Sequence, residues 1–125
     1  MEVIWKGVYP ALTTKFDKNE EPDYELFVRN LKTQIDAGVH GVILGGTLGE
    51  ASTLTSGEKE RLVRISLETS DGKIPVILNI AEGSTREAVA QARLAAEWGA
   101  DGLMVLPPMR YKPDDRECVA YFLAV

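Results

Sequence analysis

The sequence contains one cysteine, one histidine and no concentrated run of basic residues. With Cys118 alone, an intramolecular disulfide is excluded, which is typical of a reducing compartment. We interpret Cys118 as a small buried apolar side chain and His40 as a structural or surface histidine. The net charge is -5, and the basic residues are spread from Lys6 to Arg116, so the sequence predicts no nucleic-acid interface.

Long apolar runs are also missing. No stretch approaches the ~20 residues that span a membrane, and the N-terminus, with Glu2 and Lys6, lacks a signal-peptide pattern. We therefore expect a cytoplasmic protein without a membrane partner. The 125 residues, 45% of them hydrophobic, fit a single domain over residues 1–125.

Short apolar segments alternate with segments of helical periodicity along the chain. The apolar segments predict strands over 8–13, 39–44, 75–80 and 103–106. The predicted helix caps are Asp23, Thr55 or Ser56, Ser84, and Asp114 or Asp115. Four strand–helix units with short connections indicate right-handed crossovers and a parallel sheet.

Two α/β architectures fit this alternation: the first four βα units of a (β/α)8 TIM barrel, or a doubly wound sheet. Residues 37–42 and 98–103 share one form, in which a helix end is followed by glycine, a small or branched residue, a polar residue, glycine and a strand. Recurrence after two units is typical of the odd and even strands of a barrel. The barrel is favoured, and the doubly wound sheet stays open.

A glycine-rich turn, Gly45–Glu50, follows the segment 39–44. Its glycines allow a tight bend and leave backbone N–H groups exposed at the carboxyl end of the predicted strand. Such N–H groups can hold a carboxylate or a phosphate. The turn is neither G-x-G-x-x-G nor a P-loop, which weakens a nucleotide-binding interpretation.

Several motifs carry a family resemblance. They are Gly7–Thr14 with Phe16 and Asp17, Gly38–Gly41, Gly46–Thr55 with Glu58 and Lys59, Ile74–Ile77, Gly99–Gly102, and Pro107-Pro108 with Lys112-Pro113. In this order and spacing the chain resembles the amino-terminal half of the dihydrodipicolinate synthase and N-acetylneuraminate lyase family. The set covers nearly the whole chain.

The resemblance implies a (β/α)8 barrel of roughly twice this length or more. Family members bind pyruvate or another 2-oxo acid as a Schiff base on a lysine of the sixth strand, with a proton-transferring tyrosine on the fifth. The reactions include aldol condensation, retro-aldol cleavage, and dehydration or deamination. The iminium is the electron sink, so no metal and no cofactor is expected.

The resemblance also implies roles for residues of the turn. The substrate carboxylate is expected at Gly46, Thr47 and Leu48, and Thr47 is expected to act catalytically through its hydroxyl and N–H. Leu48 stands where many relatives have a second threonine. Its backbone N–H would still bind a carboxylate, but the hydroxyl of a proton relay is lost, which speaks against dihydrodipicolinate synthesis itself.

The segment after the strand 103–106 departs further from the family. Met109 and Arg110 occupy the places of two frequent tyrosines, with Tyr111 next. Arg110 is a candidate partner for a distal substrate carboxylate or a solvated loop residue, and Tyr111 a candidate replacement for the relay tyrosine. These changes favour a lyase or dehydratase/deaminase acting on a sugar-derived or hydroxyproline-derived oxo acid.

The expected Schiff-base lysine and the tyrosine would both lie beyond Val125. Of the seven lysines in the sequence, we expect only Lys112 in a loop at the carboxyl ends of the strands, where it is exposed. We therefore expect this chain alone to be inactive. Exposed edges of an open half-barrel predict a homo-oligomer. Two alternatives stay open: a non-catalytic half-barrel that assembles, with or without a bound oxo acid, and a doubly wound phosphate-binding domain.

Overall fold

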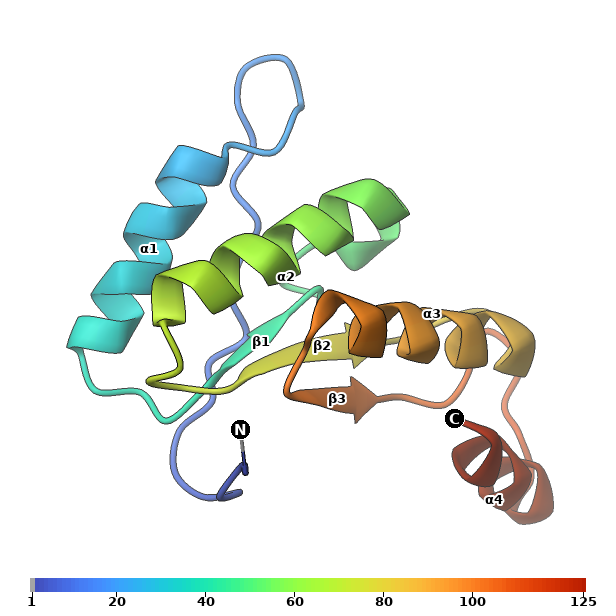
Figure 1. Cartoon of the computed structure of the whole chain (residues 1–125). Coiled ribbons are helices and arrows are strands. Elements are labelled where there is room, and N and C mark those ends of the chain that lie inside the picture. Colours follow the sequence, from blue (N-terminus) through green and yellow to red (C-terminus); the bar gives the residue numbers. More distant parts are fainter. Residues whose placement is uncertain (1) are drawn as a thin grey trace.

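Three parallel strands form one sheet in the order of the sequence, and Figure 1 shows them side by side. They are β1 (Val42–Leu44), β2 (Val76–Ile80) and β3 (Gly102–Val105). This computed structural model describes residues 2–125. The three strands confirm the predicted segments 39–44, 75–80 and 103–106, and their ends differ from the predictions by one to three residues at most.

The helices begin where the sequence places their caps. They are α1 (Tyr24–Asp36), α2 (Ser56–Ser70), α3 (Thr85–Trp98) and α4 (Asp115–Ala124), with a short 3-10 turn, η1 (Ala51–Thr53). The side chains that accept a first-turn N–H are those of Asp23, Thr55, Ser84 and Asp114. Each cap satisfies a backbone donor that has no partner inside its helix. All four predicted starts are therefore confirmed.

The predicted strand over 8–13 is wrong as a regular strand. Its backbone runs parallel to β1 but forms only an isolated bridge between Ala11 and Ile43. The Leu12 N–H donates to the Ile43 carbonyl, and the Ile43 N–H donates to the Pro10 carbonyl, at 2.9 and 3.0 Å. Pro10 has no N–H, so one ladder bond is missing, and beyond it the His40 N–H donates to the Val8 carbonyl at 2.9 Å.

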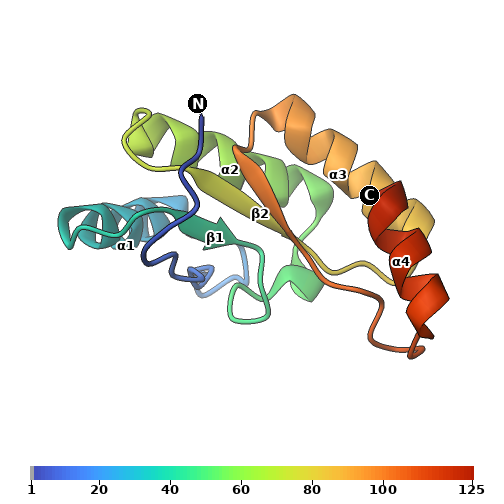
Figure 2. The same ribbon diagram turned by 90° about the horizontal axis from the view of Figure 1, so that it is seen from below.

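The hydrophobic core lies between the sheet and its helices. Val42, Leu44, Leu78 and Ile80 are buried within this core, which α1, α2 and α3 cover on one face of the sheet (Figure 2). Because side chains alternate along a strand, Asn79 lies on the opposite face. A doubly wound sheet carries helices on both faces and reverses its strand order. The fold is therefore the start of a (β/α)8 barrel, as predicted.

Helices that combine the length and apolar character needed to cross a bilayer do not occur in the described range 2–125.

Candidate active site

The turn between β1 and η1 bends back on itself at the carboxyl end of the sheet. Gly45 has a φ of +63°, in the left-handed region that glycine adopts without a Cβ penalty. The N–H of Gly49 donates to the Gly46 carbonyl, and the N–H of Glu50 donates to the Thr47 carbonyl, each at 3.0 Å. These short bonds give the turn a defined shape before any ligand arrives.

Two buried polar side chains hold the two ends of this turn. Asn79 Nδ2 donates to the Gly45 carbonyl at 3.0 Å, and Thr14 Oγ1 donates to the Gly49 carbonyl at 2.6 Å. Their exposed fractions are 4% and 7%. Sequence reasoning missed both residues. The available signal was Asn79 itself, a polar residue within an otherwise apolar strand.

The middle of the turn keeps its N–H groups free. Within residues 2–125, the backbone N–H groups of Gly46, Thr47 and Leu48 donate no hydrogen bond. Consecutive N–H groups on a fixed turn form a concave site for a carboxylate or a phosphate. The turn that was predicted to bind an anion therefore has backbone N–H donors available, and it lies at the carboxyl end of the strands.

A cavity of about 290 Å³ opens beside these groups. Its wall includes Gly46 and Thr47 from the turn, Asn79 and Glu82 from β2 and the loop after it, and Met109 from the loop after β3. Carboxyl-end loops of successive strands thus meet at one place, as in barrel active sites. The volume is at the lower end of what a small-molecule site needs.

Lys59 also reaches this cavity, from α2 rather than from a loop, and this position was not predicted from the sequence. Its Nζ lies 3.4 Å from Glu82 Oε1, and the two side chains are only 13% and 25% exposed. The ammonium group is therefore engaged with a carboxylate on the cavity wall. Lys59 adds a positive charge near the turn that its own partner offsets.

The remaining predicted site residues lie away from the cavity beside the turn. Leu48 is 66% exposed and does not contribute to the wall. Arg110 is exposed, and its side chain lines no cavity described for residues 2–125. Tyr111 is 78% exposed and lines a different cavity. The roles of all three in substrate binding stay predictions.

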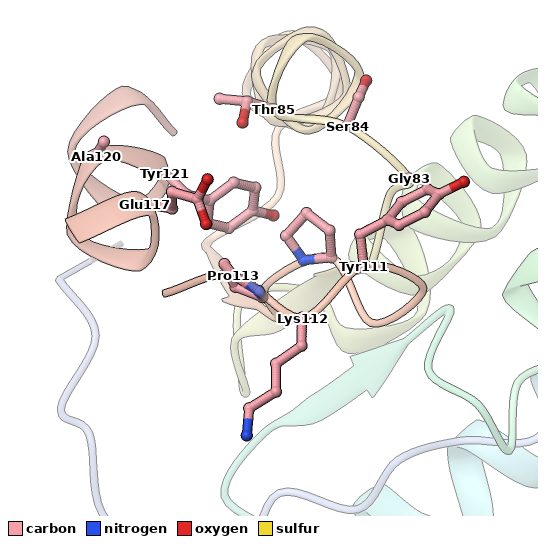
Figure 3. Close-up of a pocket in the computed structure, with 10 residues that line it drawn as sticks. Gly83, Ser84, Thr85, Tyr111, Lys112, Pro113, Glu117, Ala120 and Tyr121 are labelled. Atoms are coloured by element: carbon pink, nitrogen blue, oxygen red, sulfur yellow. The ribbon is translucent and has the colours of Figure 1, made fainter. Parts of the chain in front are cut away.

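That second cavity, of about 580 Å³, lies between the start of α3, the loop 107–113 and α4 (Figure 3). Tyr121 forms part of its wall and donates its hydroxyl to the Leu106 carbonyl at 2.7 Å. Burial raises the pKa of the Tyr121 phenol, and the negative charge of Glu82 raises it further. In Figure 3 the Lys112 amine extends away from the cavity and the Tyr111 hydroxyl points away from Tyr121.

The opposite end of the sheet holds the single histidine. His40 precedes β1, and its Nδ1 accepts a hydrogen bond from the Val8 N–H at 3.0 Å. The imidazole thereby connects the amino-terminal segment to the base of the sheet. This contact confirms the interpretation of His40 as a structural residue.

Successive parallel strands with helices outside, and a turn with free N–H groups at their carboxyl ends, define the amino-terminal part of a (β/α)8-barrel protein. The sequence model of the dihydrodipicolinate synthetase family matches residues 4–125, and the chain belongs to this family. The predicted family resemblance is thereby confirmed.

Individual relatives agree with this assignment. The 4-hydroxy-tetrahydrodipicolinate synthase of Salinibacter ruber is 37% identical over 120 residues, which are 96% of this chain and 40% of the relative. The dihydrodipicolinate synthase of Bacillus anthracis superimposes with a TM-score of 0.93 at 30% identity, over 98% of this chain and 42% of that structure. A prophage protein of the same family from E. coli K12, solved with pyruvate, gives a TM-score of 0.88 at 26% identity, over 97% and 41% of the two chains.

The chain therefore spans about two fifths of the length of the curated relatives that it matches.

Proposed function

We propose that this chain supplies the carboxylate-binding part of a Schiff-base lyase site that acts on pyruvate or a related 2-oxo acid. The observation that carries the proposal is the row of free N–H groups at Gly46, Thr47 and Leu48, of which Gly46 and Thr47 line a cavity at the carboxyl end of the sheet. Family membership and the pyruvate complex of the E. coli relative support it.

In the proposed site the turn holds the carboxylate through its N–H groups, and the Thr47 hydroxyl faces the same group. The 2-oxo carbonyl condenses with a lysine amine and releases water, and the resulting iminium accepts the electron pair of the bond that breaks. A condensation runs the same steps in the other direction. The chain's own lysine in the cavity wall, Lys59, is engaged with Glu82, so we propose that residues 1–125 alone form no productive Schiff base.

The finer assignment of the substrate rests on three departures from the family pattern. Leu48 brings no hydroxyl to the turn, and Arg110 and Met109 stand in place of tyrosines. We propose a lyase or dehydratase/deaminase reaction on a sugar-derived or hydroxyproline-derived oxo acid. Arg110 is the proposed partner for a distal carboxylate of such a substrate, and Tyr111 the proposed proton relay.

Titration of the 125-residue chain with pyruvate, followed by amide NMR, tests the carboxylate site. The N–H resonances of Gly46–Leu48 should shift with pyruvate and stay unchanged with acetone, which lacks the carboxylate. Thr47→Val should weaken pyruvate binding about two- to tenfold through the lost hydroxyl contact. Absence of any pyruvate-dependent shift at the turn would refute the proposed site.

Borohydride reduction with pyruvate tests the proposal that residues 1–125 alone form no Schiff base. We expect no covalent adduct on residues 1–125. We expect an adduct on a chimera in which the remaining barrel of the Bacillus anthracis relative follows Val125. An adduct at any of the seven lysines of the short chain would overturn the proposal that the lysine lies elsewhere.

Self-association of the chain is proposed from its surface. Exposed apolar side chains lie at the amino-terminal segment and on α4: Ile4, Trp5, Val119, Phe122 and Leu123. The outer edge of β3 pairs with no strand in the described residues. A second copy that covers these groups would give a homo-oligomer in the cytoplasm. A monodisperse monomer in analytical ultracentrifugation would argue against it.

A further inference from the structure

The proposed function uses the backbone of the turn but leaves one buried polar atom of the cavity wall without a role. Asn79 Oδ1 is buried and has no hydrogen-bond donor within residues 2–125. The side chain is 4% exposed and contributes to the wall of the cavity beside Gly46 and Thr47. Buried amide oxygens are nearly always paired, so this atom needs an explanation.

The orientation of the Asn79 amide follows from its other contact. One end of the amide lies 3.0 Å from the Gly45 carbonyl oxygen. Only the NH2 group can bond to a carbonyl, because two acceptors repel one another. The oxygen must therefore occupy the other side of the amide, and a flipped assignment is excluded.

No donor within residues 2–125 reaches Asn79 Oδ1, although Ser52 and Lys59 line the same cavity. Met104 stands opposite Asn79 in the register of β2 and β3. Ile77 precedes it on the same face of β2, and both neighbours are apolar. Because the NH2 group of the amide is already bonded, the amide oxygen is the atom left for a donor that enters the cavity.

Resting on the proposed function, we propose that Asn79 determines substrate specificity by accepting a hydrogen bond from a hydroxyl group of the bound 2-oxo acid. The carboxylate is held by the turn, whose first residue, Gly45, is fixed by the same Asn79 side chain. Because Asn79 lines the same cavity as Gly46 and Thr47, its amide oxygen is available to the rest of a ligand whose carboxylate the turn holds. The substrate class is a 2-oxo acid with a hydroxyl on the third or fourth carbon.

Two pairs of ligands of equal shape measure this hydrogen bond on the 125-residue chain. Hydroxypyruvate is compared with 2-oxobutyrate, and 4-hydroxy-2-oxobutyrate with 2-oxopentanoate, so that each pair differs only by a hydroxyl in place of a methyl group. We expect the hydroxylated member of at least one pair to bind about three- to tenfold more tightly, as a neutral buried hydrogen bond provides. Amide NMR titration gives both dissociation constants.

Two variants separate this contact from the support of the turn. Asn79→Leu keeps the approximate shape, removes the amide oxygen and should bring the affinity ratio to about one. Thr14→Val loosens the turn from its other end without touching Asn79. It should weaken pyruvate and all four ligands together and leave the ratio at its original value. Should Asn79→Leu not fold, Asn79→Ala replaces it, and the ratio in the original chain remains decisive.

The outcomes distinguish this inference from the proposed function. Pyruvate binding at Gly46–Leu48 with equal affinities in both pairs overturns the role of Asn79 alone. A preference that persists in Asn79→Leu also overturns it. Absence of binding by pyruvate and by all four ligands overturns both proposals together.

Discussion

At the amino-terminal ends of β1 and β3, Gly41 and Gly102 lie under aromatic rings, whereas Gly46 at the carboxyl end of β1 borders open space. A Cβ added at Gly41 would overlap the Tyr9 ring, and one added at Gly102 would overlap the Trp5 indole. A Cβ at Gly46 would meet no atom within 4 Å. Glycine thus provides room for packing at one end of the sheet and room for a ligand at the other.

The two ends also differ in how their backbone is supported. At the amino-terminal end Trp5 and Tyr9 stack at 6.2 Å between ring centroids, so apolar contact adds to the hydrogen bond from the Val8 N–H to His40 Nδ1. At the carboxyl end the turn is held by two hydrogen bonds, which the side chains of Thr14 and Asn79 donate to its carbonyl groups. Apolar support adds stability without direction, while hydrogen bonds fix the orientation of the N–H groups that a ligand needs.

The largest expected effect comes from placing the same methyl group at the two ends. Gly41→Ala should lower the free energy of unfolding by about 3 kcal/mol, since the Tyr9 ring must leave its position and its stacking on Trp5. Gly46→Ala should change it by less than about 0.5 kcal/mol. Urea unfolding followed by circular dichroism gives both values. Equal losses at both positions would remove the distinction between the two ends.

Thr14→Val tests the hydrogen-bonded support and should have the next largest effect. The valine keeps the shape but leaves the Gly49 carbonyl without its 2.6 Å donor in a buried place. We expect a loss of about 2 kcal/mol in the free energy of unfolding. Hydrogen exchange should also accelerate at the turn amides and not at the start of α1. Unchanged exchange at the turn would show that Asn79 alone holds it.

Local features of this fold were predictable from the sequence, and long-range ones were not. In a cap such as Thr55 with Glu58, the hydrogen-bonded residues are three positions apart in the sequence. The local pattern therefore identifies the start of a helix directly. The bonds from Thr14 and Asn79 to the turn join residues 35 and 34 positions apart, and only the folded sheet brings them together. No local pattern in the sequence contains that information.

The segment 8–13, which was predicted as a strand, also shows that local sequence does not determine long-range pairing. The segment 8–13 has the composition of a strand, yet its pairing with β1 depends on an N–H that Pro10 does not have. In the candidate site, Gly46 and Thr47 could be identified because the turn itself is a local motif. The contributions of Lys59, Glu82 and Asn79 to the cavity wall depend on how α2 and β2 pack beside that turn.

Tyr121→Phe tests the support at the end of β3 and has a pH signature. The variant loses the 2.7 Å bond to the Leu106 carbonyl, and we expect a loss of about 1 kcal/mol near neutral pH. The raised pKa of Tyr121 means that the folded protein holds the phenolic proton more tightly than the unfolded chain does. Its contribution is therefore complete below about pH 10 and is lost as the pH rises through the folded-state pKa.

Unfolding in urea at a series of alkaline pH values separates these two effects. Stability of the original chain should fall above about pH 10, and the fall should be shallower in Tyr121→Phe. It should not vanish, because burial also raises the pKa of Tyr24, against the opposing charge of Arg61. Parallel curves for the two proteins would show that Tyr121 ionises equally in both states.

The smallest effect on stability, with an opposite effect on binding, is expected for Glu82→Gln. The pair with Lys59 is partly exposed, so its loss should cost less than about 1 kcal/mol. Without the glutamate charge, the Lys59 ammonium on the cavity wall is no longer offset. Pyruvate should then bind about two- to fivefold more tightly at low salt, and the gain should shrink as salt screens the charge.

Lys59→Met is the matched control, because it removes the positive charge from the same wall and should weaken pyruvate binding at low salt. Affinities from amide NMR titration at about 0.01 M and about 1 M salt, where screening acts over ~30 Å and ~3 Å, measure both variants. Opposite shifts that converge at high salt would place the bound carboxylate within reach of Lys59. Equal affinities for both variants at low salt would place it beyond that charge, and the carboxyl end of the sheet would then bind through the turn alone.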